Sequence, residues 1–200
     1  MTTALISLGA NVAPPGRSLV ETLEIALESV AGGEGITLRR RSRWFSTPAF
    51  PPGSGPDFVN AAAALETSLE PERLLGALHG AEQALGRVRT ERPMRWAPRV
   101  CDLDLIAVGD LVLPDRATLA RWMALDLGQA QTVAPPRLVL PHPRMHERGF
   151  VLAPLADIAP GWRHPATGRT VAEMLAALPA EALAEIRPLE WAGPHPAEDS

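Results

Sequence analysis

Two acidic residues and a group of arginines lie close together between residues 87 and 104. The arginines are Arg87, Arg89, Arg92, Arg95 and Arg99, with Glu91 as the only acid among them. Asp102 and Asp104 follow within residues 100–108, an apolar stretch with the composition of a strand. Because side chains alternate along a strand, the two carboxylates share one face, roughly 6.6 Å apart at the backbone.

A pair of carboxylates on one strand face predicts a site for a divalent cation. Like charges repel unless a positive charge lies between them, and oxygen ligands suit a hard cation. Guanidinium groups hold phosphate oxygens in pairs, so the neighbouring arginines predict a polyphosphate ligand. Taken alone, an arginine-rich loop is typical of a solvated surface, and Asp-x-Asp is typical of a strand end. The two features side by side favour a metal–phosphate site.

Composition indicates one soluble globular domain, expected over residues 1–191 with a flexible tail at 192–200. The 200 residues are 46% hydrophobic and 21% charged, and the net charge of −4 argues against a general nucleic-acid binder. All 19 basic residues other than histidine are arginine, which excludes a P-loop with its lysine. The single cysteine and the absence of a signal peptide or a membrane-span window favour the cytoplasm.

Periodicity predicts the elements that position these residues, in the order β-α-β-β-α-β. The expected strands are 4–8, 36–46, 58–67 and 100–108, and the expected helices are 18–31 and 71–85. Ser18 with Glu21, and Thr170 with Glu173, form capping boxes. This order is typical of an α+β, ferredoxin-like fold, with an antiparallel or mixed sheet and its helices on one face.

Further elements are expected after this core. They are a strand at 111–113 that forms a hairpin with 100–108, a helix at 117–127, a strand at 137–140, a helix at 151–158 and a last strand at 183–189. Residues 114–136 form an insertion to which the sequence assigns no role.

Two other segments carry candidate binding residues. Residues 47–57 form a loop rich in proline and glycine that we expect to close over a ligand. Phe58 and Asn60 share the face of the strand that follows, and an aromatic ring beside an amide suits a flat heterocycle.

The segment 141–150 concentrates histidine, arginine and an aromatic residue. His142 and His146 raise the alternative of zinc, but no cysteine or glutamate accompanies them at the usual spacing. Phosphate contacts by His142 and Arg148 fit the segment better.

Several motifs occur in a specific order along the chain. They are Ser7-Leu-Gly-Ala-Asn11, Phe45-Ser-Thr-Pro48, Asp57-Phe-Val-Asn-Ala-Ala62, Gly86-Arg-Val-Arg89, Arg95-Trp-Ala-Pro-Arg99, Asp102-Leu-Asp104, Pro141-His142 and Arg148-Gly-Phe150. The ordered set closely resembles the 6-hydroxymethyl-7,8-dihydropterin pyrophosphokinases, enzymes of folate synthesis. The resemblance runs from about residue 3 to about residue 190 apart from 114–136.

The resemblance implies that the two terminal phosphates of ATP pass to the hydroxymethyl oxygen of the pterin, leaving AMP. It implies two Mg²⁺ ions on Asp102 and Asp104, with Arg87 and Arg99 as the other catalytic residues. The implied pterin contacts are Thr47, Pro48, Phe50, Phe58, Asn60 and Phe150. The implied ATP contacts are Glu82, Arg89, Trp96, Arg99, Leu105, Arg137, His142 and Arg148.

The expected partners are therefore ATP and the hydroxymethyl pterin, with no nucleic acid and no membrane, for a chain expected to act as a monomer. The sequence departs from the family pattern at Ala10, where serine is usual, at Phe58, where tyrosine is common, and at His79, where glutamine is frequent. Two rival interpretations remain. One is a nucleotidyltransferase that releases pyrophosphate from the same metal site, and the other is a non-catalytic ferredoxin-like binding module.

Overall fold

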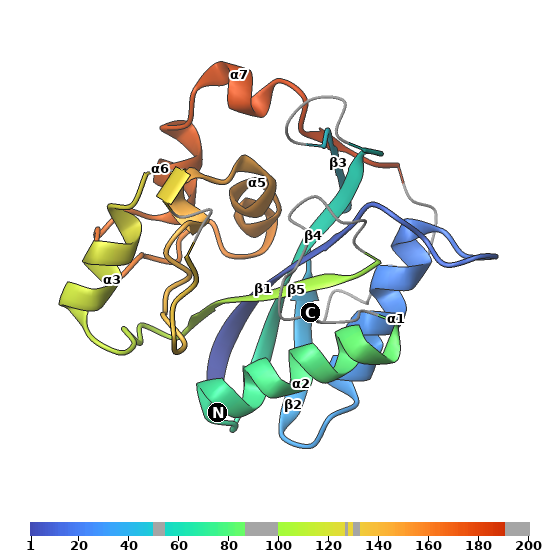
Figure 1. Cartoon of the computed structure of the whole chain (residues 1–200), viewed down its shortest axis with the longest axis horizontal. Helices are drawn as coiled ribbons and strands as arrows, with labels where there is room; N and C mark the ends of the chain where they lie inside the picture. Colours follow the sequence, from blue (N-terminus) through green and yellow to red (C-terminus); the bar gives the residue numbers. More distant parts are fainter. Residues whose placement is uncertain (50–54, 87–99, 127, 130–132, 191–200) are drawn as a thin grey trace.

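The computed structural model describes residues 1–49, 55–86, 100–126, 128–129 and 133–190. The core elements are β1 (Thr2–Ala10), α1 (Leu19–Ala31), β2 (Ile36–Arg41), β3 (Phe45–Thr47), β4 (Phe58–Thr67), α2 (Pro71–Ala84) and β5 (Asp102–Val108). The later elements are α3 (Arg116–Met123), the 3₁₀ helix η1 (Met145–Glu147), α5 (Gly149–Ile158), α6 (Val171–Ala176), α7 (Ala180–Leu183) and β6 (Arg187–Pro188) (Figure 1).

The strands form one sheet in the order β5-β1-β4-β3-β6, and β2 also pairs with β4. The pairs β1–β4, β1–β5, β2–β4 and β3–β4 are all antiparallel. Thus β1 lies between β5, the last strand of the core, and β4. The split βαβ connections of a ferredoxin-like fold require this order. The predicted fold class is confirmed.

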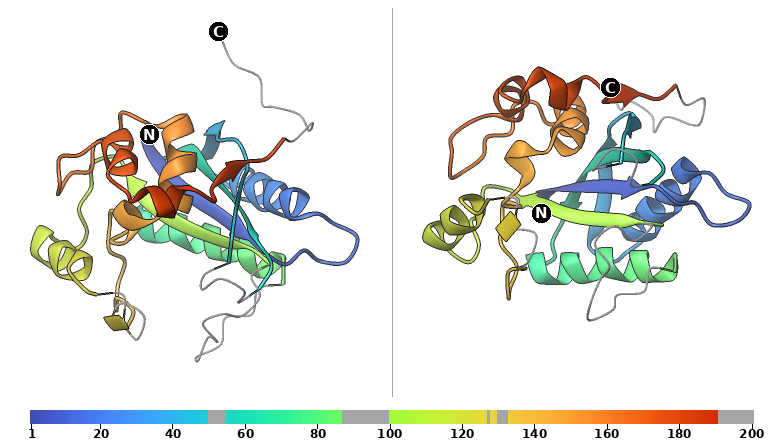
Figure 2. Two further views of the ribbon diagram at one scale, coloured as in Figure 1. Left: turned by 90° about the horizontal axis from the view of Figure 1, so that it is seen from above. Right: turned by 45° about the horizontal axis from the view of Figure 1, so that its top comes forward.

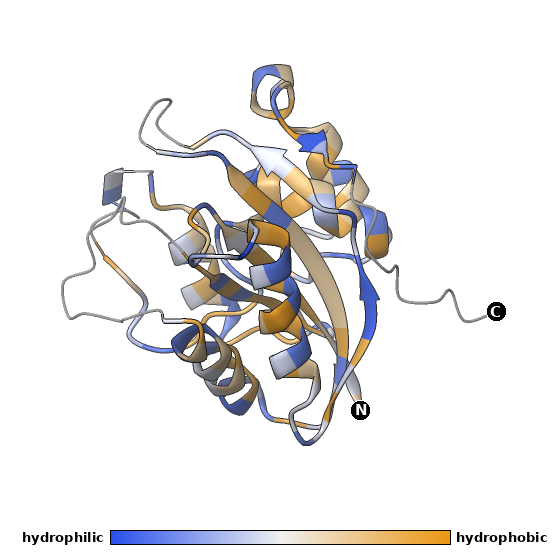
Figure 3. Cartoon of the chain, turned by 90° about the vertical axis from the view of Figure 1, so that its right-hand side faces the viewer, coloured by the Kyte–Doolittle hydropathy of each residue, from blue (hydrophilic) through white to orange (hydrophobic). Residues whose placement is uncertain are grey.

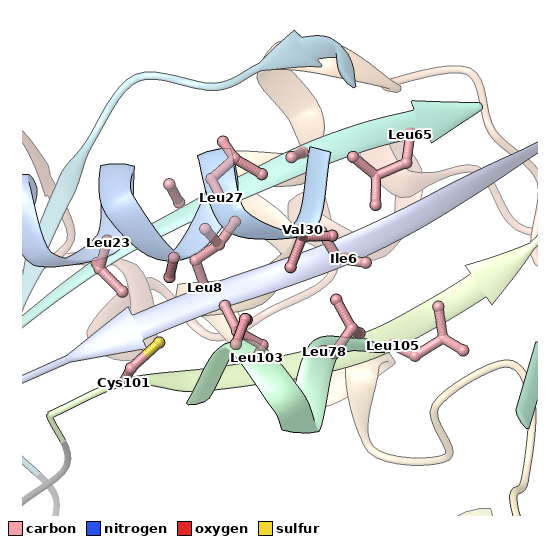
Figure 4. Packing of buried hydrophobic residues seen from close by; sticks show 14 of the residues in the cluster. Ile6, Leu8, Leu23, Leu27, Val30, Leu65, Leu78, Cys101, Leu103 and Leu105 are labelled. Atoms are coloured by element: carbon pink, nitrogen blue, oxygen red, sulfur yellow. The ribbon is translucent and has the colours of Figure 1, made fainter. Parts of the chain in front are cut away.

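Two apolar clusters cover the two faces of this sheet. On one face the register partners Leu8, Ala61 and Leu103 pack beneath α1 and α2. The helices contribute Leu23, Leu27 and Leu78 to this cluster (Figure 4), and Leu74 belongs to it as well. On the other face Leu5 and Ala64 pack against α5, so the sheet lies between α2 and α5 (Figure 2).

The expectation that the helices lie on one face therefore holds for α1 and α2 but is wrong for α5. The reason lies in β4, whose residues from Val59 to Leu65 are all buried, so both of its faces need a covering layer. Four consecutive alanines, Ala61–Ala64, keep both faces shallow enough for helices to approach closely. By contrast, β2 ends in three consecutive arginines and forms the hydrophilic strand beside β4 (Figure 3).

The helix starts follow the predicted signals. Ser18 Oγ accepts the N–H of Glu21 at 3.2 Å, and the Glu21 carboxylate accepts the Ser18 N–H at 2.7 Å. Thr170 and Glu173 form the same reciprocal pair at α6, and Pro71 occupies the first position of α2.

The predicted strand 36–46 is broken into β2 and β3. Arg41 pairs with Ala63 and Phe45 pairs with Asn60, so three residues stand opposite two. Ser42 keeps the ladder closed, because its N–H donates to Ala62 O and its Oγ accepts the Ala62 N–H, both at 2.9 Å.

The predicted strands at 111–113 and 137–140 reduce to one antiparallel bridge between Leu113 and Leu140. A proline follows each of these residues, and a proline cannot donate a ladder hydrogen bond. The predicted helix 117–127 is the shorter α3, capped by Asp115. The predicted strand 183–189 shortens to β6, because α7 occupies its beginning.

The C-terminal segment contacts both the edge of the sheet and the start of α5. Arg187 and Pro188 pair with β3, and Leu189 N–H donates to Trp44 O at 2.8 Å. A Cβ on Gly149, the first residue of α5, would lie 2.7 Å from Ile186 Cδ1 and 3.2 Å from Ala182 O, so glycine favours this close approach. None of the described helices has the length and apolar character that a membrane crossing requires.

The buried His164 side chain stabilises the loop before α6 by accepting hydrogen bonds from its backbone. The His164 side chain is 0% exposed, and its Nδ1 accepts the N–H groups of Ala166 and Thr167 at 3.2 and 3.3 Å. Its Nε2 has no hydrogen-bond partner within the described ranges. Burial, and secondarily the charge of His146, lower the pKa of His164 to about 4.

This shift predicts acid lability. Below pH 6.5 the unfolded chain binds a proton at His164 that the folded chain excludes until its own pKa of about 4. The contribution of His164 to the free energy of unfolding is therefore fully present above pH 6.5. It is lost as the pH falls toward 4, by up to about 3 kcal/mol. Urea unfolding of the native chain and of His164→Asn, which keeps an acceptor oxygen but does not titrate, should diverge over this range. Parallel pH profiles for the two proteins would contradict the expectation.

Candidate active site

The pairing of β1 with both of its neighbours places the predicted carboxylates and the predicted amide on one face of the sheet. Gly9 pairs with Asn60 of β4 and with Asp102 of β5, and Ser7 pairs with Asp104. Directly paired residues point to the same face, so the side chains of Asn60, Asp102 and Asp104 share it. Two strand spacings, roughly 10 Å, separate Asn60 from Asp102 at the backbone.

Small residues form the floor between these polar side chains. A Cβ on Gly9 would lie 3.0 Å from Asn60 Oδ1, so glycine lets the amide extend over β1. Sequence reasoning did not identify Ser7 and Gly9 as site residues. Their signal was a pair of small residues on one face of a central strand, which becomes meaningful only once the neighbouring strands are known.

The face that carries these residues is the face that α5 covers. Arg148, the residue before α5, places its Nη1 3.9 Å from Asp104 Oδ2. Its guanidinium carbon lies 5.7 Å from the centre of the Phe150 ring. Both members of the Arg148–Asp104 pair are about one-third exposed, and such a pair contributes little to stability. Because both side chains reach the surface, a ligand on this face can contact their charges.

His142 is a neutral donor beside this pair. Its backbone N–H donates to Ile106 O at 2.8 Å, and its ring Nδ1 accepts the backbone N–H of Arg144 at 3.2 Å. An occupied Nδ1 leaves the ring proton on Nε2. Burial, then the charge of Arg148, lower the pKa of His142 to about 3, against an opposing effect of Asp102. The imidazole therefore stays uncharged at neutral pH and offers an N–H to an anion.

The heterocycle side of the site lies on β3 and β4. Asn60 is buried, and its Nδ2 donates to Thr47 Oγ1 at 2.8 Å, which fixes the direction of the amide. Pro48 follows Thr47 and is exposed, while Phe58 is half-buried beside them. Phe150 is 39% exposed at the start of α5, so an aromatic surface is available to a ligand on this face.

Three of the expected ATP contacts lie elsewhere. Glu82 and Leu105 are buried on the opposite face, with α2 and the first apolar cluster. Arg137 is exposed, and its charge acts on Asp115, the cap of α3. The structure does not bring these three side chains together with the carboxylates. The other expected residues Phe50, Arg87, Arg89, Trp96 and Arg99 lie outside the described residues.

The two carboxylates fit a magnesium ion. Within the described ranges no group of three or more His, Cys, Asp or Glu side chains could hold a metal. Mg²⁺ is commonly held by one or two carboxylates, with waters and substrate phosphates completing its shell. Asp102 and Asp104 are both partly exposed, as such shared coordination requires.

Comparisons with known proteins identify the family of the chain. A family model described as 7,8-dihydro-6-hydroxymethylpterin-pyrophosphokinase (HPPK) matches residues 5–160. A protein of Synechocystis sp. is 37% identical over 191 residues, which are 95% of this chain and 84% of that protein. A protein of Pseudomonas aeruginosa is 38% identical over 178 residues, 89% of this chain and 93% of that protein. Both are named 2-amino-4-hydroxy-6-hydroxymethyldihydropteridine pyrophosphokinase.

Solved structures share the fold. The wild-type HPPK-DHPS protein of Plasmodium falciparum superposes with a TM-score of 0.60 at 14% identity. The same protein with pteroate gives a TM-score of 0.62 at 12% identity. Each match covers 88% of this chain and 44% of the other, so the chain spans less than half of those proteins. The match of the family model over residues 5–160, together with relatives at 37% and 38% identity, shows that the chain belongs to the 7,8-dihydro-6-hydroxymethylpterin-pyrophosphokinase family.

Proposed function

We propose that the chain transfers the terminal diphosphate of ATP to the hydroxymethyl oxygen of 6-hydroxymethyl-7,8-dihydropterin, releasing AMP, as a step of folate biosynthesis. One observation carries the proposal beyond family membership. The amide of Asn60 and the carboxylates of Asp102 and Asp104 lie on one sheet face, across a strand with small side chains. A heterocycle held at the amide would place its hydroxymethyl group toward phosphates held at the acids.

The phosphate side of the site would work by charge and position. Asp102 and Asp104 would hold two Mg²⁺ ions, which would supply positive charge to the phosphate oxygens. Arg148 adds a positive charge beside Asp104, and His142 adds a neutral N–H donor. Phosphoryl transfer of this kind needs no protein nucleophile, because positioning and electrostatics supply most of the rate.

The pterin side would work by edge recognition and stacking. Asn60, oriented by Thr47, would hydrogen-bond the edge of the ring, and the backbone near Pro48 would complete that edge. Phe58 and Phe150 would stack on the two faces of the ring. Holding both substrates in one orientation converts a bimolecular reaction into an effectively unimolecular one.

The remaining roles rest on the family resemblance. We assign phosphate contacts to Arg87, Arg89 and Arg99, a nucleotide contact to Trp96, and a pterin contact to Phe50. We also infer that the chain acts in the cytoplasm as a monomer. The single cysteine supports a reducing compartment, and the monomeric state is our own inference.

The reaction itself gives the first test. Incubation with ATP should yield AMP only when both Mg²⁺ and the hydroxymethyl pterin are present. Asp104→Ala should lower kcat at least about a hundredfold, because the charge on the phosphates is no longer neutralised. Asp110→Ala, in the turn that follows β5, is the matched control and should keep the native rate. Release of pyrophosphate in place of AMP would identify a nucleotidyltransferase, and an active Asp104→Ala would refute the metal assignment.

The orientation of Asn60 gives a second test. Thr47→Val keeps the shape of the side chain but removes the oxygen that accepts from Asn60 Nδ2. The buried amide is then partly unsatisfied, so the KM for the pterin should rise about tenfold while the KM for ATP stays near its native value. Ser46→Ala, one residue earlier and on the other face of β3, should change neither constant. Equal changes in both constants for Thr47→Val would argue against a specific pterin role.

A further inference from the structure

Glu82 lies within the protein on the side of the sheet away from the candidate active site. The residues that α2 buries are Pro71, Leu74, Leu78, Ala81 and Glu82. The Glu82 side chain is 0% exposed. Burying a carboxylate is unfavourable unless hydrogen bonds replace its water, and an apolar residue would fill the same position without that cost. The choice of an acid here therefore points to a specific contact.

That contact is with the strand that carries the two active-site acids. Glu82 Oε1 accepts the N–H of Leu103 at 2.8 Å. Leu103 lies between Asp102 and Asp104, and its own side chain packs in the cluster beneath α2. The donating N–H belongs to the peptide group that joins Asp102 to Leu103. Holding this group limits rotation of the backbone at Asp102, and so limits the direction of its carboxylate.

The position of β5 explains why such a hold is useful. β5 is the last strand on its side of the strand order, and Asp102 is its first residue. β1 pairs with one edge of β5, from Asp102 onward. Strand ends open more easily than strand centres. Glu82 holds the other edge of β5 through its hydrogen bond to Leu103, between the two residues whose carboxylates must point to the same cation.

We propose that Glu82 is a positioning residue that holds β5 so that Asp102 and Asp104 bind a divalent cation together. This inference rests on the proposed function and replaces the nucleotide contact that the family resemblance implies for Glu82. The effect passes through the acceptor oxygen that holds the Leu103 N–H, and the negative charge of Glu82 is not required for it. Loss of the acceptor oxygen should therefore weaken metal binding, whereas loss of the charge alone should not.

The test measures Mn²⁺ binding to the full chain by electron paramagnetic resonance, in the presence of a nonhydrolysable ATP analogue and without turnover. Glu82→Met has a similar length and lacks the acceptor oxygen, while Glu82→Gln keeps an acceptor oxygen and loses the charge. Leu74→Ala leaves a cavity on the same face of α2, two turns earlier, and controls for loosened packing. The KM for the pterin, which binds two strands from Asp102, is measured in parallel.

Glu82→Met should weaken Mn²⁺ binding, and raise the Mg²⁺ concentration for half-maximal rate, about tenfold, with the pterin KM unchanged. Glu82→Gln and Leu74→Ala should bind Mn²⁺ as the native chain does. Native Mn²⁺ binding by a folded Glu82→Met would overturn the inference. An equal loss of Mn²⁺ affinity in Glu82→Gln and Glu82→Met would overturn it too. If Glu82→Met does not fold, Glu82→Ala takes its place in both comparisons. If the native chain binds Mn²⁺ but makes no AMP, the proposed function fails while the role of Glu82 is still decided.

Discussion

The antiparallel pairing of β1 with both β4 and β5 is the constraint on which the candidate site depends. It places Gly9 between Asn60 and Asp102 and Ser7 beside Asp104. Each strand alone carries only a local pattern of polar residues. The register between strands turns three separate patterns into one surface, and a slip of one residue would send either set of side chains to the opposite face.

One face of the sheet carries the core beneath α1 and α2, and the other face carries the candidate site. The face beneath α1 and α2 is covered by one apolar cluster, and the carboxylate of Glu82 is buried on the same side. The other face is apolar where α5 packs on Leu5 and Ala64, and polar where Asn60 and the two acids lie. The site therefore rests on a sheet whose reverse side is fully packed. Such support keeps the polar groups in place before a ligand binds.

Sequence reasoning succeeded where a signal was local. The alternation of Asp102 and Asp104 on one strand, the capping box at Ser18 and the order of the core elements were all readable from neighbouring residues. It failed where the outcome depended on distant pairing. The break after Arg41 follows from the register with β4, and the bridge of Leu113 follows from a partner 27 residues later, at Leu140. The contact of Glu82 with Leu103 joins α2 to β5 over 21 residues of sequence, and no local pattern relates these two positions.

One distance tests the shared face most directly. With Mn²⁺ in place of Mg²⁺ and a nonhydrolysable ATP analogue bound, the paramagnetic relaxation of the hydroxymethyl protons of the pterin reports their separation from the metal. A shared face with two strand spacings between the amide and the acids predicts a separation of roughly 10 Å or less. A separation of about twice that or more, beyond the reach of adjacent strands, would mean that the pterin and the metal bind at different places.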